Sequence, residues 1–278
     1  MSAGRRPGVR PAARAGRNVA LVALWAFTLF PVAWMLMTAV NPSAAGGNAK
    51  PSGVTLENFR FVLGEGHFGR YLLNSTLVAA GTVLASGVLA LLAAVAVSRF
   101  RFRFRTAVLM LVLVVQMVPL EALVIPLFIQ ARNLQLLNSL LGLVVVYVAF
   151  SLPFAIWTLR GFVAAIPVDI EEAAYVDGAS WTRMFFSILL PLVAPGLVAT
   201  SVFSFITAWN EFVFALTFLN DDSKYTVAVG LRTFFGLHST NWGAVMAGST
   251  LITIPVMVFF VLVQRRLTAG LVAGASKG

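Results

Sequence analysis

Six long apolar stretches, separated by short segments that hold most of the charged residues, dominate the sequence. Each is about 20 residues or longer, the length that an α-helix needs to cross the hydrocarbon core of a bilayer. Each is apolar around most of its circumference, which is typical of a membrane span, and no stretch alternates in the manner of a lipid-facing β-strand. The sequence therefore predicts an all-α integral membrane protein with six transmembrane helices, at about residues 19–40, 71–97, 106–130, 140–159, 191–219 and 243–263.

The composition agrees with lipid surroundings. Hydrophobic residues make up 59% of the 278 residues and charged residues 11%, against about a quarter charged in soluble domains. The chain has no cysteine, which excludes disulfides and thiolate metal sites. Two isolated histidines, His67 and His238, are too few for a metal cage without carboxylates, so no metal site is expected.

The placement of the basic residues predicts the topology. If the N-terminus is cytoplasmic, the cytoplasmic segments hold fourteen Lys and Arg residues and the outer segments six. Such an excess is typical of cytoplasmic loops, so both termini are expected inside. A basic tail (1–18) then precedes the transmembrane domain (19–264), and a cytoplasmic tail (265–278) follows it. The first apolar stretch exceeds the about 7–15 residues of a cleaved signal and is interpreted as a retained anchor.

The net charge of +10 raises the possibility of nucleic-acid binding. Arginine and phenylalanine alternate from Arg99 to Arg105, a pattern that could hold RNA bases. Because this run lies directly between two spans, an interaction with anionic lipid headgroups, worth about 1 kcal/mol per charge, is the favoured interpretation. We expect a lipid bilayer and no nucleic acid as partner.

The loop at 161–190, on the expected cytoplasmic side, is unusual in its charge. Four of the ten acidic residues of the chain lie within nine positions of it, namely Asp169, Glu171, Glu172 and Asp177. Pro167 suits the first position of a helix, where acidic residues face the positive end of the helix dipole. Gly178 provides a left-handed stop, and Ser180 can cap a second short helix. The loop is therefore predicted to form two short helices joined at an elbow.

This elbow is either a solvated loop with ordinary caps or a docking surface. The pair Ala173 and Ala174 removes bulk where a partner could approach. The second helix also carries more large apolar side chains than a free helix in water would expose, namely Trp181, Met184, Phe185 and Phe186. We favour the docking surface.

The same loop resembles the EAA motif of binding-protein-dependent ABC transporter permeases. Glu172-Ala-Ala, three residues, Gly178, nine residues and Ile188-Leu-Leu-Pro191 match the spacing of that motif without departure. The resemblance covers nearly the whole chain, including Asn74-Ser75 and Trp209-Asn210-Glu211-Phe212. The C-terminal residues are similar to those of the MalG-like carbohydrate branch, with Ser276 where valine is usual.

The resemblance implies a type I ABC importer permease fold and a set of partners. In this family two permease subunits, usually non-identical, pair above a cytoplasmic ATPase dimer, and an extracytoplasmic solute-binding protein delivers the sugar. The chain itself would be no enzyme and would bind no cofactor, with ATP-Mg held by the ATPase; the sequence has no phosphate-binding glycine loop followed by Lys-Ser/Thr. The stretch from Val118 to Leu123 is similar to permeases for chitobiose or N-acetylglucosamine, so a di- or oligosaccharide or an amino sugar is expected.

The resemblance also implies roles for particular segments. The tail 270–278 would reach between the ATPase subunits, and the outer loop 220–242 would contact the binding protein. Coupling to the ATPase is expected at Glu171, Glu172, Ala173, Ala174, Asp177 and Gly178.

Polar residues inside spans are candidates for the transport pathway, because they are costly in lipid. Gln116, Glu121, Trp209 and Asn210 are selected on this basis. Counting ~1.5 Å per residue places Gln116 near mid-membrane and Glu121 further out. Three alternatives stay open: Gln116 bonds a neighbouring helix, Asn210 stabilises the fold around Pro195, and Glu211 extends to water.

Two other classes of protein are weighed against an importer permease. An ion-driven secondary transporter would explain six spans and buried acids, but it gives no reason for an acidic elbow in the cytoplasm. An intramembrane enzyme needs a nucleophile and a base at membrane depth, and both histidines fall in outer loops. The importer permease is the interpretation that accounts for the loop.

Overall fold

The computed structural model describes residues 11–42, 53–236 and 240–275, and the side chains of 16–42, 53–236 and 240–264. All regular structure within these ranges is helical, apart from one isolated β-bridge between Phe235 and Thr240. The all-α expectation is confirmed. Several residues of the sequence argument lie outside the described residues, namely Arg5, Arg6, Arg10, Lys50, His238, Ser276 and Lys277.

Five helices within the described ranges are long and apolar enough to cross a membrane, and a bent pair would bring the number to six. The five are Gly16–Ala39, Phe68–Arg99, Leu140–Ala164, Trp181–Asn210 and Trp242–Gln264. They belong to α1 (Pro11–Ala39), α3 (Phe68–Arg99), α6 (Leu140–Ala164), a run that ends in α9 (Leu190–Asn210), and α12 (Trp242–Ala275). The bent pair is Arg105–Gln116 with Leu120–Asn133.

The chain divides into two compact units. The first consists of the residues up to Gly66 together with Phe234–Leu251, and the second consists of His67–Thr233 together with the residues from Ile252 onward. In the first unit, Asn58 of α2 (Glu57–Leu63) donates hydrogen bonds to the carbonyls of Ala39 and Asn41, at 2.9 and 3.1 Å. These bonds satisfy carbonyls that the end of α1 leaves free.

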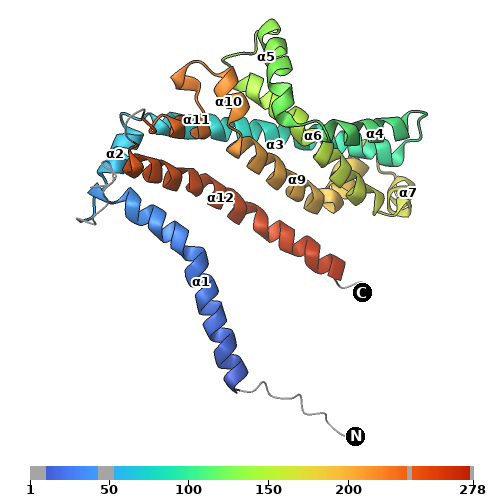
Figure 1. The fold of residues 1–278 in the computed structure, drawn as a ribbon. Helices are drawn as coiled ribbons and strands as arrows, with labels where there is room; N and C mark the ends of the chain where they lie inside the picture. The colour runs from blue at the N-terminus through green and yellow to red at the C-terminus, as the bar shows by residue number, and fades with distance from the viewer. Residues whose placement is uncertain (1–10, 43–52, 237–239, 276–278) are drawn as a thin grey trace. The chain divides into compact units, whose positions relative to one another are not determined.

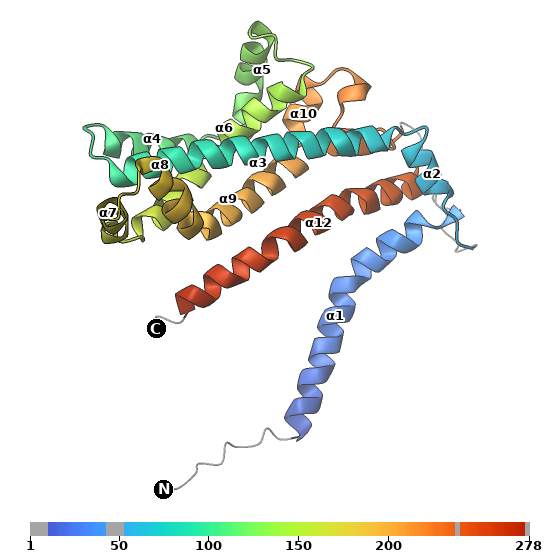
Figure 2. The same cartoon turned by 180° about the vertical axis from the view of Figure 1, so that it is seen from behind.

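The core of the second unit is the packing of α3 against α6 and α9 (Figure 1). Small residues of α3, Ala90 and Ala94, are fully buried there and allow the neighbouring helices to approach closely. Seen from behind, α3 runs the length of this unit, with α7 (Val168–Val176) and α8 (Trp181–Met184) at the end where α3 finishes (Figure 2).

The stretch expected to be one span at 106–130 is sharply bent. α4 (Arg105–Gln116) ends before Pro119, and a 3-10 turn, η2 (Leu120–Leu123), leads into α5 (Val124–Asn133). The two helical parts make an angle of 97°. Proline has no N–H to continue the helix, and it disfavours helical backbone at the residue before it, so the break follows from Pro119.

The apolar helix expected at 191–219 instead begins at Trp181 and ends at Asn210. α8, a π-helical turn η3 (Phe185–Leu189) and α9 form one continuous run, so the separate second helix of the predicted elbow is the first turn of a long helix. The π-helical turn ends two residues before Pro191, which lacks the N–H that a regular helical bond needs. Extended backbone at Glu211 ends the run, and α10 (Val213–Phe218) follows.

Candidate functional site

Helix α7 has one buried face and one exposed face. Glu171 and Ala174, three residues apart and therefore on the same side of the helix, are 7% and 6% exposed. Glu172, Ala173 and Asp177 are exposed. The set of coupling residues selected from the sequence is thus split, because Glu171 and Ala174 point into the bundle. Ala174 packs in the apolar core of this unit rather than making room for a partner.

The buried face of α7 is bonded to the end of α3. The guanidinium of Arg99 donates from Nε to the Glu171 carboxylate at 2.7 Å and from Nη2 to the carbonyl of Ile166 at 3.0 Å. Only 12% of the Arg99 side chain and 9% of the Glu171 side chain are exposed. Arg99 was expected to interact with lipid headgroups; its charge is instead paired within the chain, whereas Arg101 and Arg103 stay exposed.

The elbow after α7 is set by Gly178, whose φ of +80° lies in the left-handed region. The N–H of Ala179 bonds the carbonyl of Ala174 at 2.9 Å, and the N–H of Gly178 bonds that of Tyr175 at 3.0 Å. This pair of bonds is a Schellman motif, which closes a helix end with a residue in the left-handed conformation. The left-handed stop predicted at Gly178 is confirmed.

Some of the residues after the elbow are buried within the chain itself. Ser180 caps α8 by accepting a hydrogen bond from the N–H of Arg183 at 3.4 Å, as predicted. Met184 and Phe185 are buried against α3 and α6. Trp181 stacks on Phe185 with ring centroids 5.2 Å apart and remains 46% exposed. Part of the apolar surface that suggested a partner is therefore core.

What remains exposed on α7 combines carboxylates with apolar side chains. Val176 is 87% exposed and Tyr175 44%, next to the carboxylates of Glu172 and Asp177 and the methyl group of Ala173. We call these five residues the α7 outer face. Apolar and acidic groups on a short helix suit a protein partner that offers an apolar slot and a basic group.

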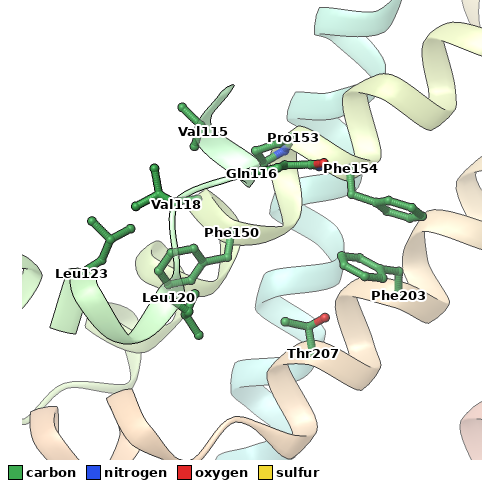
Figure 3. Close-up of a pocket in the computed structure, with 11 residues that line it drawn as sticks. Val115, Gln116, Val118, Leu120, Leu123, Phe150, Pro153, Phe154, Phe203 and Thr207 are labelled. Atoms are coloured by element: carbon green, nitrogen blue, oxygen red, sulfur yellow. The ribbon is translucent and has the colours of Figure 1, made fainter. Parts of the chain in front are cut away.

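A cavity of about 420 Å³ lies between α4, η2, α6 and α9 (Figure 3). Its walls are mainly apolar and aromatic, with the Phe154 and Phe203 rings 4.1 Å apart between centroids. Gln116 and Thr207 contribute polar side chains, and the Gln116 amide extends toward Phe154 (Figure 3). The cavity is lined by Val115, Gln116, Val118, Leu120, Leu123, Ala149, Phe150, Pro153, Phe154, Phe203 and Thr207.

The four candidate pathway residues, all within the described ranges, are not gathered in one place. Gln116 lines this cavity, and Glu121 is exposed in the adjoining turn η2. Trp209 is 2% exposed and lines a different, apolar hollow of about 390 Å³ with residues of α3 and α12. Asn210 is exposed, and its amide donates to the carbonyl of Ile206 at 2.9 Å within its own helix, away from Pro195.

Glu211 does not simply extend into water. Its carboxylate accepts hydrogen bonds from the N–H groups of Phe214 at 2.9 Å and Ala215 at 3.1 Å, which closes the start of α10. It also accepts a hydrogen bond from the hydroxyl of Tyr147 in α6. Glu211 therefore joins three helices. The sequence offered no signal for this partner, because Tyr147 lies inside an unbroken apolar stretch.

The N-terminal end of α3 is hydrogen-bonded to a segment that lies about 150 residues later in the chain. Contacts between residues so far apart cannot be predicted from sequence spacing. Asn74 donates from Nδ2 to the carbonyls of Ser223 and Tyr225, each at 3.0 Å. Ser75 accepts a hydrogen bond from the N–H of Val227 at 2.8 Å. The segment comprises η4 (Asp222–Lys224) and α11 (Val227–Arg232). These contacts give a structural reason for the Asn74-Ser75 pair.

Comparison with known proteins gives consistent results. Residues 86–272 match the family described as binding-protein-dependent transport system inner membrane component. The chain is 40% identical over 265 residues to the diacetylchitobiose uptake system permease protein DasC of Streptomyces coelicolor, covering 94% of this chain and 96% of that protein. It is 38% identical over 255 residues to the trehalose/maltose transport system permease protein MalG of Thermococcus litoralis, covering 90% and 92%.

A solved structure has a similar fold. The crystal structure of a bacterial ABC transporter involved in the import of the acidic polysaccharide alginate contains a chain that matches with a TM-score of 0.78. The match covers 94% of this chain and 99% of that chain, at 22% sequence identity.

Proposed function

Because this chain belongs to the family of binding-protein-dependent transport system inner membrane components, we propose that it forms half of the membrane pathway of a sugar importer. Its relatives named above act in the uptake of diacetylchitobiose and of trehalose and maltose, and they align with it over at least 90% of its length. A di- or oligosaccharide, or an amino sugar such as chitobiose, is therefore the proposed substrate. A second permease subunit provides the other half of the pathway.

The observation that carries the coupling proposal is the division of α7 into two faces. Its buried face is fixed to the bundle, which leaves Glu172 and Asp177 free to meet a basic group of a partner. Ala173 allows close approach, and Gly178 sets the direction of the chain beyond the helix. We assign this partner to a cytoplasmic ATPase dimer that holds ATP-Mg, and this chain itself catalyses no reaction.

The cavity at Gln116 is the proposed contact of this subunit with the sugar. Gln116 and Thr207 can exchange hydrogen bonds with hydroxyl groups, and the rings of Phe154 and Phe203 can cover the apolar face of a sugar ring. We keep Glu121, Trp209 and Asn210 as secondary pathway candidates, because Glu121 borders the cavity and the other two end α9.

The segment held by Asn74 and Ser75 is proposed to lie on the outer side, where a solute-binding protein docks. ATP binding and hydrolysis would then alternate the pathway between inward and outward openings. A ligand shifts such an equilibrium only through its different affinities for the two states, so the contact at α7 has to be rigid. We also propose that both termini lie in the cytoplasm.

The test is a charge reversal on the α7 outer face. The Glu172→Lys variant should insert into the membrane normally and lose ATP-dependent uptake, because a lysine repels the basic group that the carboxylate meets. Glu57→Lys makes the same charge change at an exposed position of α2 and should keep uptake. Normal sugar accumulation by the Glu172→Lys complex would refute the coupling role.

A further inference from the structure

Helix α7 is attached to the bundle by very few groups. Its buried residues are Glu171 and Ala174. Ala174 brings a single methyl group, and apolar stabilisation scales with the area removed from water, so its packing fixes the helix only weakly. The hydrogen bond from Arg99 to Glu171 is therefore the main directional attachment of α7, and the bond from Arg99 to the carbonyl of Ile166 holds the connection just before this helix.

The geometry of the Arg99 side chain makes this attachment rigid. One planar guanidinium reaches two points at once, the Glu171 carboxylate on α7 and the carbonyl of Ile166 in the connection from α6. The donors of a guanidinium form a fixed fork, so two bonds to separate acceptors define orientation as well as distance. A displacement of α7 has to move the end of α3 or break the bond between Arg99 and Glu171.

Helix α3 is suited to carry such a displacement across the membrane. It has 32 residues, which at ~1.5 Å per residue is a rod of roughly 48 Å. Among the span-length helices in the described part of the chain, α3 alone has no internal proline; the others contain Pro31, Pro153, Pro195 and Pro255. Prolines are the usual sites of helix kinks, so α3 is the straightest available connection.

We propose that Arg99 and Glu171 are positioning residues that pass the movement of α7 to α3, and through Asn74 and Ser75 to the segment around Ser223 at the other end. This inference rests on the proposed function, since it requires an ATPase that moves α7. Neither residue touches the transported sugar. Their task is to keep ATP hydrolysis and sugar movement in a fixed ratio.

The experiment uses the complete importer in proteoliposomes, with its second permease subunit, ATPase and binding protein. Sugar imported per ATP hydrolysed is measured with whichever of diacetylchitobiose, trehalose and maltose the wild-type complex imports. Arg99→Gln and Glu171→Gln should each lower this ratio about fivefold or more, with ATPase activity retained. The double variant should lose no more than Arg99→Gln alone, because the bond that Glu171→Gln removes is one of the two that Arg99→Gln removes. Arg132→Gln, at an exposed arginine of α5, is the control for lost charge.

The possible results distinguish a failure of this inference from a failure of the proposed function. A wild-type complex without ATP-dependent uptake of these sugars would contradict the proposed function. If the wild-type complex imports sugar and the single variants keep its ratio of sugar imported to ATP hydrolysed, the inference alone is overturned. The inference alone is also overturned if the fold loss of the double variant is the product of the two single losses. If Arg99→Gln fails to assemble, Arg99→Lys replaces it, since an ammonium group keeps the charge without the planar fork. Its ratio should also fall, and an unchanged ratio would overturn the proposal.

Discussion

The hydroxyl of Tyr147, in the first half of α6, donates a hydrogen bond to the carboxylate of Glu211, which follows α9. Tyr147 is fully buried, and Glu211 at the same time closes the start of α10. A buried hydroxyl bonded to a carboxylate is among the stronger single contacts that a helical bundle can form. Three helices thus meet at one carboxylate, so its hydrogen bond with Tyr147 should contribute to the stability of the bundle.

The Tyr147→Phe variant removes this hydrogen bond and leaves the ring in place. Because the acceptor is a carboxylate, the expected loss of stability is about 1.5–3 kcal/mol. Thermal unfolding of the purified chain in mild detergent measures it. Tyr175→Phe, which removes the hydroxyl of a tyrosine that is 44% exposed, serves as the control and should unfold as the wild type does. Equal unfolding temperatures for the two variants would show that the Glu211 contact adds nothing.

Replacing Gln116 by alanine tests the cavity as a sugar contact. Loss of one hydrogen bond to the sugar should weaken apparent affinity by about 1 kcal/mol, or roughly fivefold, without changing ATPase activity in the absence of sugar. The measurement is the sugar concentration that gives half-maximal uptake. Gln130→Ala removes the same amide from an exposed position of α5 and should leave that concentration unchanged. A Gln116→Ala variant with wild-type affinity would place the sugar elsewhere.

The elbow after α7 depends on the backbone conformation of Gly178. A Cβ at this position would meet no atom within 4 Å, so the cost of Gly178→Ala comes from its φ of +80° alone. That cost is about 1–2 kcal/mol and should change the direction of the chain at the elbow, which reduces uptake. Gly161→Ala is a matched control, because a Cβ there is also unobstructed and φ is not in the left-handed region. Equal uptake by the two variants would show that the elbow tolerates other conformations.

The segment around Asp221 should respond to acid. Hydrogen bonds from Ser223, with a smaller contribution from the charge of Lys224, lower the pKa of the Asp221 carboxyl from its ordinary value of 3.8. A carboxylate whose pKa is lower in the folded state stabilises the fold above the ordinary value, and the effect is lost as the pH falls below it. The protection factors of the amide hydrogens at 221–225, which compare measured with intrinsic exchange rates, should therefore fall below about pH 3.8 in the wild type. In Asp221→Asn these protection factors should already be lower at pH 7, and identical protection factors for both proteins would contradict this.

Much of the fold can be predicted from local chemistry. Runs of apolar residues define the long helices, Pro119 explains the break after α4, and Gly178 with Ser180 defines the elbow. Each of these signals acts within a few residues of the chain, where backbone sterics and capping decide the conformation. The start and end of the apolar helix expected at 191–219 were missed because its apolar residues already begin before α9, at Phe185 and Phe186.

The candidate site was less predictable, because its contacts join distant residues. Arg99 and Glu171 lie 72 positions apart, and Tyr147 and Glu211 lie 64 apart. The adjacent acids Glu171 and Glu172 look alike in the sequence, yet successive residues of a helix point about 100° apart, so one is buried and the other exposed. The rotation of α7 about its axis decides whether Glu171 or Glu172 points into the bundle. This rotation is set by the tertiary contact with Arg99.

The most direct test of the account is a cross-link at Glu172. Since the chain contains no cysteine, Glu172→Cys provides a single thiol at the α7 outer face. In intact cells, a short thiol-directed cross-linker should join this position to the ATPase subunit, and a membrane-impermeant thiol reagent added outside should leave it unmodified. A thiol at position 172 that reacts with the external reagent, or that never captures the ATPase, would contradict the claim that force enters the bundle through α7.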